Sequence, residues 1–170
     1  MLAVILSLSL AMILAFLWYA GLKKRRQSAI SALKLIHQKM DLRMDLLHSY
    51  STEARASWSA NYQKRFNKLT QLEAQSEWNE TLDQDLGAQL STWQKLDTEL
   101  NQFIEVLDDK VLPDDKRHAQ EQLASDIEQV QNFYNQTVSE LNSGVRILPC
   151  DVVAKVTNIT PLPSFSLQTA

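Results

Sequence analysis

Hydrophobic and polar positions divide the chain into three regions. Residues 2–22 contain no charged side chain. Between residues 28 and 145, apolar residues return every three or four positions, which is the spacing of one face of a helix. After residue 148 this periodicity stops and prolines recur. The pattern predicts an all-α protein: an N-terminal transmembrane helix, an antiparallel bundle of three to four long helices, and an irregular C-terminal tail.

The first region has the length and the flanks of a membrane span. About 20 residues at about 1.5 Å each match a hydrocarbon core of about 30 Å. Trp18 and Tyr19 stand where aromatic side chains meet lipid headgroups. Four basic residues follow directly: Lys23, Lys24, Arg25 and Arg26. Basic residues mark the cytoplasmic end of a span, so we expect a single pass through the bacterial inner membrane with the N-terminus outside.

Two further features agree with a retained anchor and with a cytoplasmic bundle, respectively. A cleaved signal peptide carries positive charge before its apolar run, whereas here only Met1 precedes the run and the charge follows it. Cys150 is the only cysteine, so no internal disulfide can form, and an unpaired thiol suits a reducing compartment. We therefore expect residues 1–22 to stay attached as the anchor, followed by a basic juxtamembrane segment at residues 23–27.

The soluble part is predicted to be a helical bundle at residues 28–148, with residues 149–170 as a tail packed on it. Residues 28–76 form either one helix or two helices bent around residues 49–52. Later stripes run from Leu82 to Val111 and from Leu123 to Val145, and Pro113 separates them. Gly144 is expected to form a left-handed cap. A stripe sustained along a long helix also suits a coiled coil.

Charge is divided unevenly along the soluble part. Residues 23–68 hold eleven Lys or Arg against three Asp or Glu, and the remainder holds six against seventeen. Because the basic half begins at the membrane, it predicts attraction to anionic lipid and pairing with the acidic helices. We do not expect nucleic-acid binding.

The third stripe and the tail resemble the LemA family of bacterial membrane proteins. The similarity is carried by Ile127, Tyr134-Asn135, Val138, Asn142, Leu148-Pro149, Val153-Ala154 and Phe165, and upstream by the motif from Arg43 to Leu47. The departures are Leu141 for a second tyrosine, Gln131 for an arginine, Ala124 for a glutamate, and Ile159 where a phenylalanine follows glycine. The resemblance implies a divergent member: a helical bundle on a membrane anchor, with no established catalytic activity.

The family motif supplies the first candidate site. Asn135 and Asn142 lie seven residues apart, which places them on one helix face. They and Tyr134 either hold the tail through bonds to its backbone or bind a partner. The structural role is favoured because buried Asn and Tyr normally satisfy neighbouring polar groups. Val138, Pro149 and Ala154 complete the motif.

Other candidate chemistry is explained more simply by structure. His37 and Asp41 have the spacing of two metal ligands on one face, but no HExxH or CxxC motif accompanies them. Cys150 has no histidine near it in sequence. The pairs Asp108-Asp109 and Asp114-Asp115 lack the alternating ligands of a calcium loop. Trp58 and Trp93 lie on apolar stripes, and Trp78 does not. We therefore assign no catalytic, cofactor-binding or metal-binding residue.

These features together predict a membrane-anchored scaffold or accessory subunit and not an enzyme. Its expected partners are the lipid bilayer and either an unidentified protein or a second copy of itself. No small-molecule substrate is evident. The alternative is a membrane-tethered ligand-binding sensor or enzyme with a pocket built from Tyr134, Asn135, Asn142 and the tail.

Overall fold

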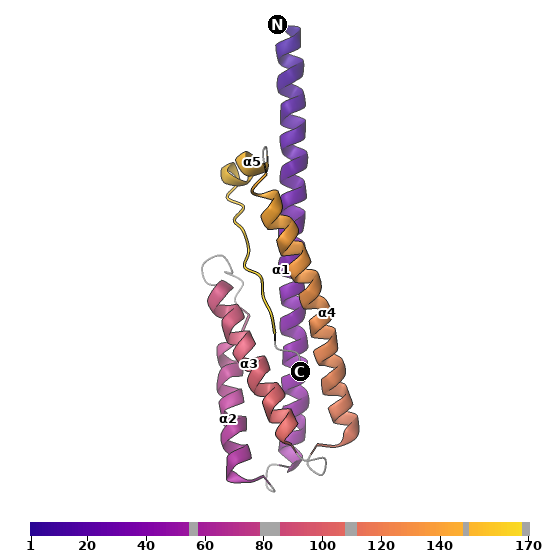
Figure 1. The fold of residues 1–170 in the computed structure, drawn as a ribbon, viewed down its shortest axis with the longest axis vertical. Helices are drawn as coiled ribbons and strands as arrows, with labels where there is room; N and C mark the ends of the chain where they lie inside the picture. Colours follow the sequence, from indigo (N-terminus) through magenta and orange to yellow (C-terminus); the bar gives the residue numbers. More distant parts are fainter. Residues whose placement is uncertain (55–57, 79–85, 108–111, 148–149, 168–170) are drawn as a thin grey trace. The chain divides into compact units, whose positions relative to one another are not determined.

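The computed structural model describes residues 1–54, 58–78, 86–107, 112–147 and 150–167. This part of the chain contains five helices and no strand, which confirms the all-α prediction there (Figure 1). The helices are α1 (Leu2–Ala54), α2 (Ala60–Gln75), α3 (Leu86–Val106), α4 (Asp114–Gly144) and α5 (Cys150–Val156).

The first helix is continuous over 53 residues, so the apolar segment and the first stripe belong to one element. Of the two alternatives for residues 28–76, the structure has two helices, but α1 continues through residues 49–52 and ends at Ala54. Ser51 and Thr52 donate hydrogen bonds of 2.8 and 2.9 Å to the carbonyl of His48, so these hydroxyls are accommodated inside the helix. The second helix begins at Ala60, and the side chain of the preceding Ser59 caps it by accepting from the backbone N–H of Tyr62 at 3.4 Å.

Exposure changes along α1. Up to Leu17 the large apolar side chains are exposed, whereas a buried stripe begins at Leu22 and continues through Leu33, Ile36, Met40, Met44 and Leu47. The apolar segment near the N-terminus is long and apolar enough to cross a membrane, and none of it is buried. In this segment Ser7 and Ser9 donate to carbonyls of their own helix, which leaves neither hydroxyl without a partner.

The chain divides into two compact units. The first unit consists of residues 1–32 and 132–164, and the second of residues 33–131 and 165–170. Both long helices, α1 and α4, contribute residues to both units.

In the second unit, two pairs of helices, α2 with α3 and α1 with α4, contact each other in antiparallel order. Along α2 and α3, Tyr62 donates to the carbonyl of Val106 and Lys68 pairs with Glu99. Along α1 and α4, Lys39 pairs with Asp126, while Arg43 pairs with Gln120, a residue nearer the start of α4. Figure 1 shows α2 and α3 running in opposite directions.

In the first unit, Gly144 lies against α1. A Cβ at residue 144 would stand 3.0 Å from Cδ2 of Leu22, and Arg25 pairs with Glu140 at 3.4 Å. The expected left-handed cap at Gly144 is wrong, because its φ is not positive and Val145 continues the helical bonding to Leu141 at 2.9 Å. The missing side chain serves the close approach of α1 instead.

The tail is less irregular than predicted, because it begins with the short helix α5. Asn158 ends this helix with φ 54°, the left-handed conformation that glycine usually supplies. Ile159 N–H then bonds back to the carbonyl of Ala154 at 2.9 Å, and Asn158 N–H to that of Lys155 at 3.5 Å. This is the Schellman arrangement, and it reverses the chain so that it runs back along α4 (Figure 1).

Candidate functional site

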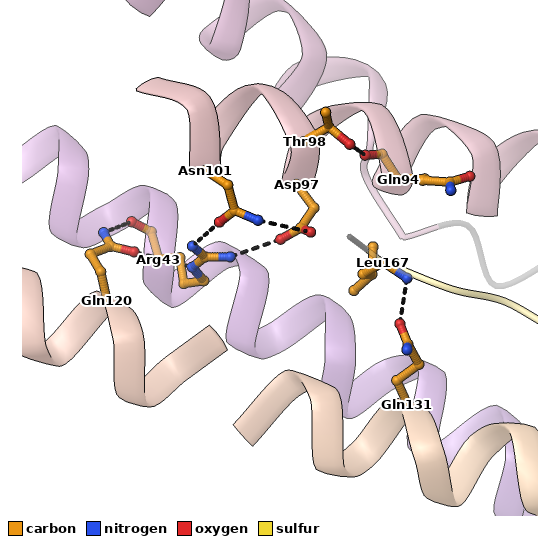
Figure 2. A network of polar contacts seen from close by, with 8 residues as sticks. All are labelled: Arg43, Gln94, Asp97, Thr98, Asn101, Gln120, Gln131 and Leu167. Carbon is orange, nitrogen blue, oxygen red and sulfur yellow. Dashed lines mark hydrogen bonds and ion pairs between the residues drawn. The ribbon is translucent and has the colours of Figure 1, made fainter. Parts of the chain in front are cut away.

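The second unit contains a buried polar network around Arg43 of α1, which is 2% exposed (Figure 2). Its Nη1 donates to Oδ1 of Asp97 at 2.8 Å, and its Nη2 donates to Oδ1 of Asn101 at 2.7 Å. Its Nε donates to Oε1 of Gln120 at 3.2 Å, and the Gln120 amide donates to the Arg43 carbonyl at 2.8 Å. Each guanidinium nitrogen thus has a partner, and one arginine joins α1 to α3 and α4.

Burial shapes the charge balance of this network. Loss of hydration lowers the pKa of Arg43, and the neighbouring Asp97 acts in the opposite direction. Burial likewise raises the pKa of Asp97, whereas Arg43 and the amide of Asn101 lower it. An arginine does not lose its proton in a protein, so a fixed positive charge stays in the core. Asp97 is therefore required as its counter-charge.

A cavity of about 300 Å³ adjoins the network. Arg43, Asn101 and Gln120 contribute to its lining, together with Arg117. Three glutamates also line it: Glu105, Glu121 and Glu128. Both signs of charge are thus present, which suits a polar or zwitterionic molecule better than a simple anion.

The network was not predicted, although the sequence contains a signal for it. Arg43 follows Met40 by three residues and precedes Leu47 by four, which is the spacing of the buried stripe. Asp97 stands likewise between Trp93 and Leu100. A charged residue at a stripe position on two different helices indicates a buried ion pair, because a lone buried charge is costly.

The motif residues of α4 meet the tail in the first unit. Tyr134 donates its hydroxyl to the carbonyl of Pro163 at 2.6 Å. The Asn142 amide donates to the carbonyl of Leu162 at 2.8 Å, and the Leu162 N–H donates to Oδ1 of Asn142 at 3.0 Å. Burial raises the pKa of Tyr134, which keeps the phenol neutral and able to donate. These two side chains therefore hold the tail through its backbone.

The remaining motif residues take several places. Val138 and Ala154 are buried, at 2% and 4% exposure. Asn135 is half-buried. Pro149 lies outside the described residues.

The end of the tail has a second attachment, within the second unit. The Leu167 N–H donates to Oε1 of Gln131 at 2.5 Å (Figure 2). The ring of Phe165 packs edge-on against Trp93, with 6.3 Å between centroids. Gln131, a departure from the family pattern, thus has a structural use in this chain.

His37 belongs to an aromatic cluster. Its Nε2 accepts from the backbone N–H of Trp78 at 2.9 Å, and its Nδ1 lies 3.1 Å from Asp41. Trp78 stacks on Trp93 at 5.8 Å, so this tryptophan packs although it lies off the stripe. Trp58 and Trp93 are buried at 5% and 0% exposure, as their stripe positions predicted.

Other candidate ligands are dispersed. Within the described ranges, no group of three or more His, Cys, Asp or Glu side chains is placed to hold a metal ion. Asp114 and Asp115 lie in the first turn of α4, and residues 108–109 lie outside the described part. Cys150 is half-buried at the start of α5. At the predicted membrane flank, Lys23 lies over the Tyr19 ring at 5.7 Å.

Comparison with known proteins gives no identification. No protein-family model, no curated protein and no solved structure matches this chain.

Proposed function

We propose that this protein is a non-catalytic scaffold or accessory subunit anchored in the bacterial inner membrane. Residues 2–22 would cross the bilayer once, with the N-terminus outside and the helical part in the cytoplasm. The observation that carries the proposal is the change in exposure along one continuous helix, from exposed apolar side chains before Leu17 to a buried stripe from Leu22.

The membrane span is supported because the alternatives, a core helix, a helix exposed to water and a cleaved signal peptide, fit the structure less well. A core helix would be mostly buried, whereas in this apolar segment the large apolar side chains up to Leu17 are all exposed. Soluble proteins rarely leave a contiguous apolar patch of more than a few hundred Å² in water. Cleavage after the apolar run would also remove Leu22, which is 2% exposed and packs beside Gly144. A bilayer accounts for the apolar segment and leaves Leu22 in place.

The orientation rests on charge. Four basic residues follow the apolar segment directly, at positions 23–26. An excess of Lys and Arg marks the cytoplasmic side of a span. This favours the helical part inside the cell.

An antiparallel bundle is the arrangement that the contacts of the second unit favour. The pairs α2 with α3 and α1 with α4 run in opposite directions, and the Arg43 network joins α1, α3 and α4. Helices with one apolar stripe each are stable only when the stripes are buried together. We propose that residues 28–148 fold in this way.

A scaffold role is supported by the use of the polar residues. Tyr134 and Asn142 bind the tail of their own chain. On α1, Leu35 and Leu42 are 41% and 51% exposed, and exposed Gln38 lies between them on the same face. We propose that this exposed face, which contains Leu35, Gln38 and Leu42, is the surface that contacts a protein partner or a second copy of the chain.

Crosslinking in cells tests the scaffold. A photo-crosslinking residue replaces Gln38 in the full chain, and a matched control carries it at exposed Gln102 of α3. The proposal predicts one specific adduct at position 38 that is absent at 102 and is lost in a Leu35→Glu, Leu42→Glu background. Equal or absent adducts at the two positions would contradict it.

Membership of the LemA family is also a proposal. It is supported by the spacing of Tyr134-Asn135, Asn142 and Val153-Ala154. The left-handed φ of Asn158 adds support, because the family pattern places a glycine before the aromatic residue at the position of Ile159.

The cavity favours a second candidate function, a ligand-binding sensor. It adjoins buried Arg43 in the second unit, and its lining includes none of Tyr134, Asn135 and Asn142, from which the sequence had suggested a pocket. Thermal unfolding with amino acids, nucleotides and small dicarboxylates tests it. A saturable rise in melting temperature that an Ala124→Phe substitution in the cavity lining abolishes would favour the sensor over the scaffold.

A further inference from the structure

Three apolar side chains are exposed where α4 ends and along α5. Ile147, Val152 and Val156 are 61%, 54% and 82% exposed. Val152 and Val156 lie one turn apart on the same face of α5, and Ala154, on another face, is only 4% exposed. The short helix is thus fixed by its alanine side, and its valine face is uncovered by the described part of the chain.

The position of this end of α4 along α1 is fixed by two contacts. Gly144 meets Leu22, the last residue of the apolar segment, and Glu140 pairs with Arg25 one turn further along α1. Since residue 140 lies opposite residue 25 and residue 144 opposite residue 22, α4 runs toward the apolar segment. The chain leaving Gly144 is therefore directed toward the level at which a span would enter the headgroups.

The chain also returns to this end of α4. Leu162 bonds through both of its backbone groups to Asn142, after the reversal at Asn158. The α5 helix therefore belongs to a short excursion whose two ends are tied to the last turn of α4 (Figure 1). We name Ile147 together with α5 the α5 foot.

We propose that the α5 foot rests in the headgroup region of the same bilayer that residues 2–22 cross, with Ile147, Val152 and Val156 in contact with lipid. This inference rests on the proposed membrane span. A helix with an apolar face and flanking basic residues lies in the plane of the interface, with its apolar face at the boundary of the acyl chains.

The charges around the foot match a lipid surface. Arg146 and Lys155 are exposed, and Lys155 is 3.0 Å from Asp151, one turn earlier. Residues 23–26 of α1 add four basic side chains just past Leu22. Basic side chains near the bilayer attract the anionic lipids of a cytoplasmic leaflet. The foot would hold the first unit against the membrane and so set its orientation.

Site-specific quenching by lipid tests the foot in the full chain. Single cysteines are introduced in a Cys150→Ser background as Val152→Cys and as Val156→Cys. Phe16→Cys serves as the reference for the span, and Val106→Cys, at a valine that is 44% exposed in the second unit, serves as the matched control. Each is labelled with a fluorophore and reconstituted in phosphatidylcholine vesicles containing some phosphatidylglycerol, with or without lipid that carries a nitroxide near its headgroup.

The outcomes separate the two proposals. Several-fold stronger quenching at positions 152 and 156 than at position 106 supports the foot. Quenching at position 16 together with signals at 152 and 156 that match position 106 overturns the foot and leaves the span intact. If position 16 is not quenched, the span itself fails, and the foot fails with it.

Discussion

At the residue scale, the polar side chains of Arg43 and Asn142 form hydrogen bonds within their own chain. Arg43 joins three helices, and Asn142 binds both backbone groups of Leu162. The sequence predicted that Asn142 either ties the tail or binds a partner, because amides at helical spacing suit both roles. It did not predict the Arg43 network, because which stripe residues face one another depends on how the helices pair in space.

Asp97→Leu should be strongly destabilising. It leaves the charge of Arg43 buried without its counter-ion, which costs about 3–5 kcal/mol. Adding Arg43→Leu should recover much of that loss, because the double variant buries no charge. Chemical denaturation of the full chain in detergent measures the free energy of unfolding of the single and the double variant. As a control, Lys34→Leu at an exposed position on α1 should change little. Equal stability of the Asp97→Leu variant and the Lys34→Leu control would contradict the requirement for Asp97 as the counter-charge.

Tyr134→Phe should weaken folding at neutral pH by about 1 kcal/mol, because it removes the bond to the Pro163 carbonyl. Burial raises the pKa of Tyr134 above the ordinary tyrosine value of 10.0. The phenol therefore stabilises the folded chain fully below pH 10.0, and that contribution is lost as pH rises through the raised pKa. Ultraviolet titration should show that the last phenolate to form disappears in Tyr134→Phe; an unchanged final step would contradict this.

At the element scale, the period of the hydrophobic residues predicted the existence of a helix more reliably than the residues at which it begins and ends. The stripes ending near Val111 and beginning at Leu123 correspond to α3 and α4. The polar cluster near Ser51 suggested a bend, but the Ser51 hydroxyl donates to the carbonyl of His48 in the preceding turn and the helix continues. The helix α5 escaped prediction because seven residues show too little periodicity, and its stop at Asn158 depends on a backbone conformation.

Asn142→Ala should release the part of the tail that follows α5. It removes two bonds to the backbone of Leu162, a residue only 8% exposed, at a cost of about 1–3 kcal/mol. Hydrogen exchange of residues 159–165 should accelerate, while the amides of α3 keep their protection. Asn132→Ala, at an exposed position on the same helix, is the matched control. Slow exchange of Leu162 in the Asn142 variant would show that other contacts hold the tail.

At the scale of the whole molecule, one helix contains both an uncovered apolar segment and a buried apolar stripe. The sequence predicted the apolar segment from its length and lack of charge, and the structure leaves that segment uncovered. The sequence could not show that α1 continues to Ala54, because nothing in the periodicity marks where the apolar segment ends and the first stripe begins. Cys150, the only cysteine, lies beyond this helix and offers a probe of orientation.

Labelling of Cys150 should depend on the integrity of the inner membrane. If the helical part is cytoplasmic, a membrane-impermeant maleimide leaves the cysteine unmodified in cells whose outer membrane alone is opened, and modifies it after the inner membrane is permeabilised. Since the thiol is half-buried, denatured protein gives the reference for full reaction. Equal labelling before and after permeabilisation would place α5 outside the cytoplasm.

Alkaline carbonate extraction of membranes from cells that make the full chain tests the anchor most directly. A span held by the exposed apolar residues of α1 should remain in the membrane pellet. A Leu8→Arg, Ile13→Arg variant, with two charges placed in the segment where these side chains are 60% and 57% exposed, should be retained far less. Release of the unaltered chain into the supernatant would contradict a membrane-spanning α1.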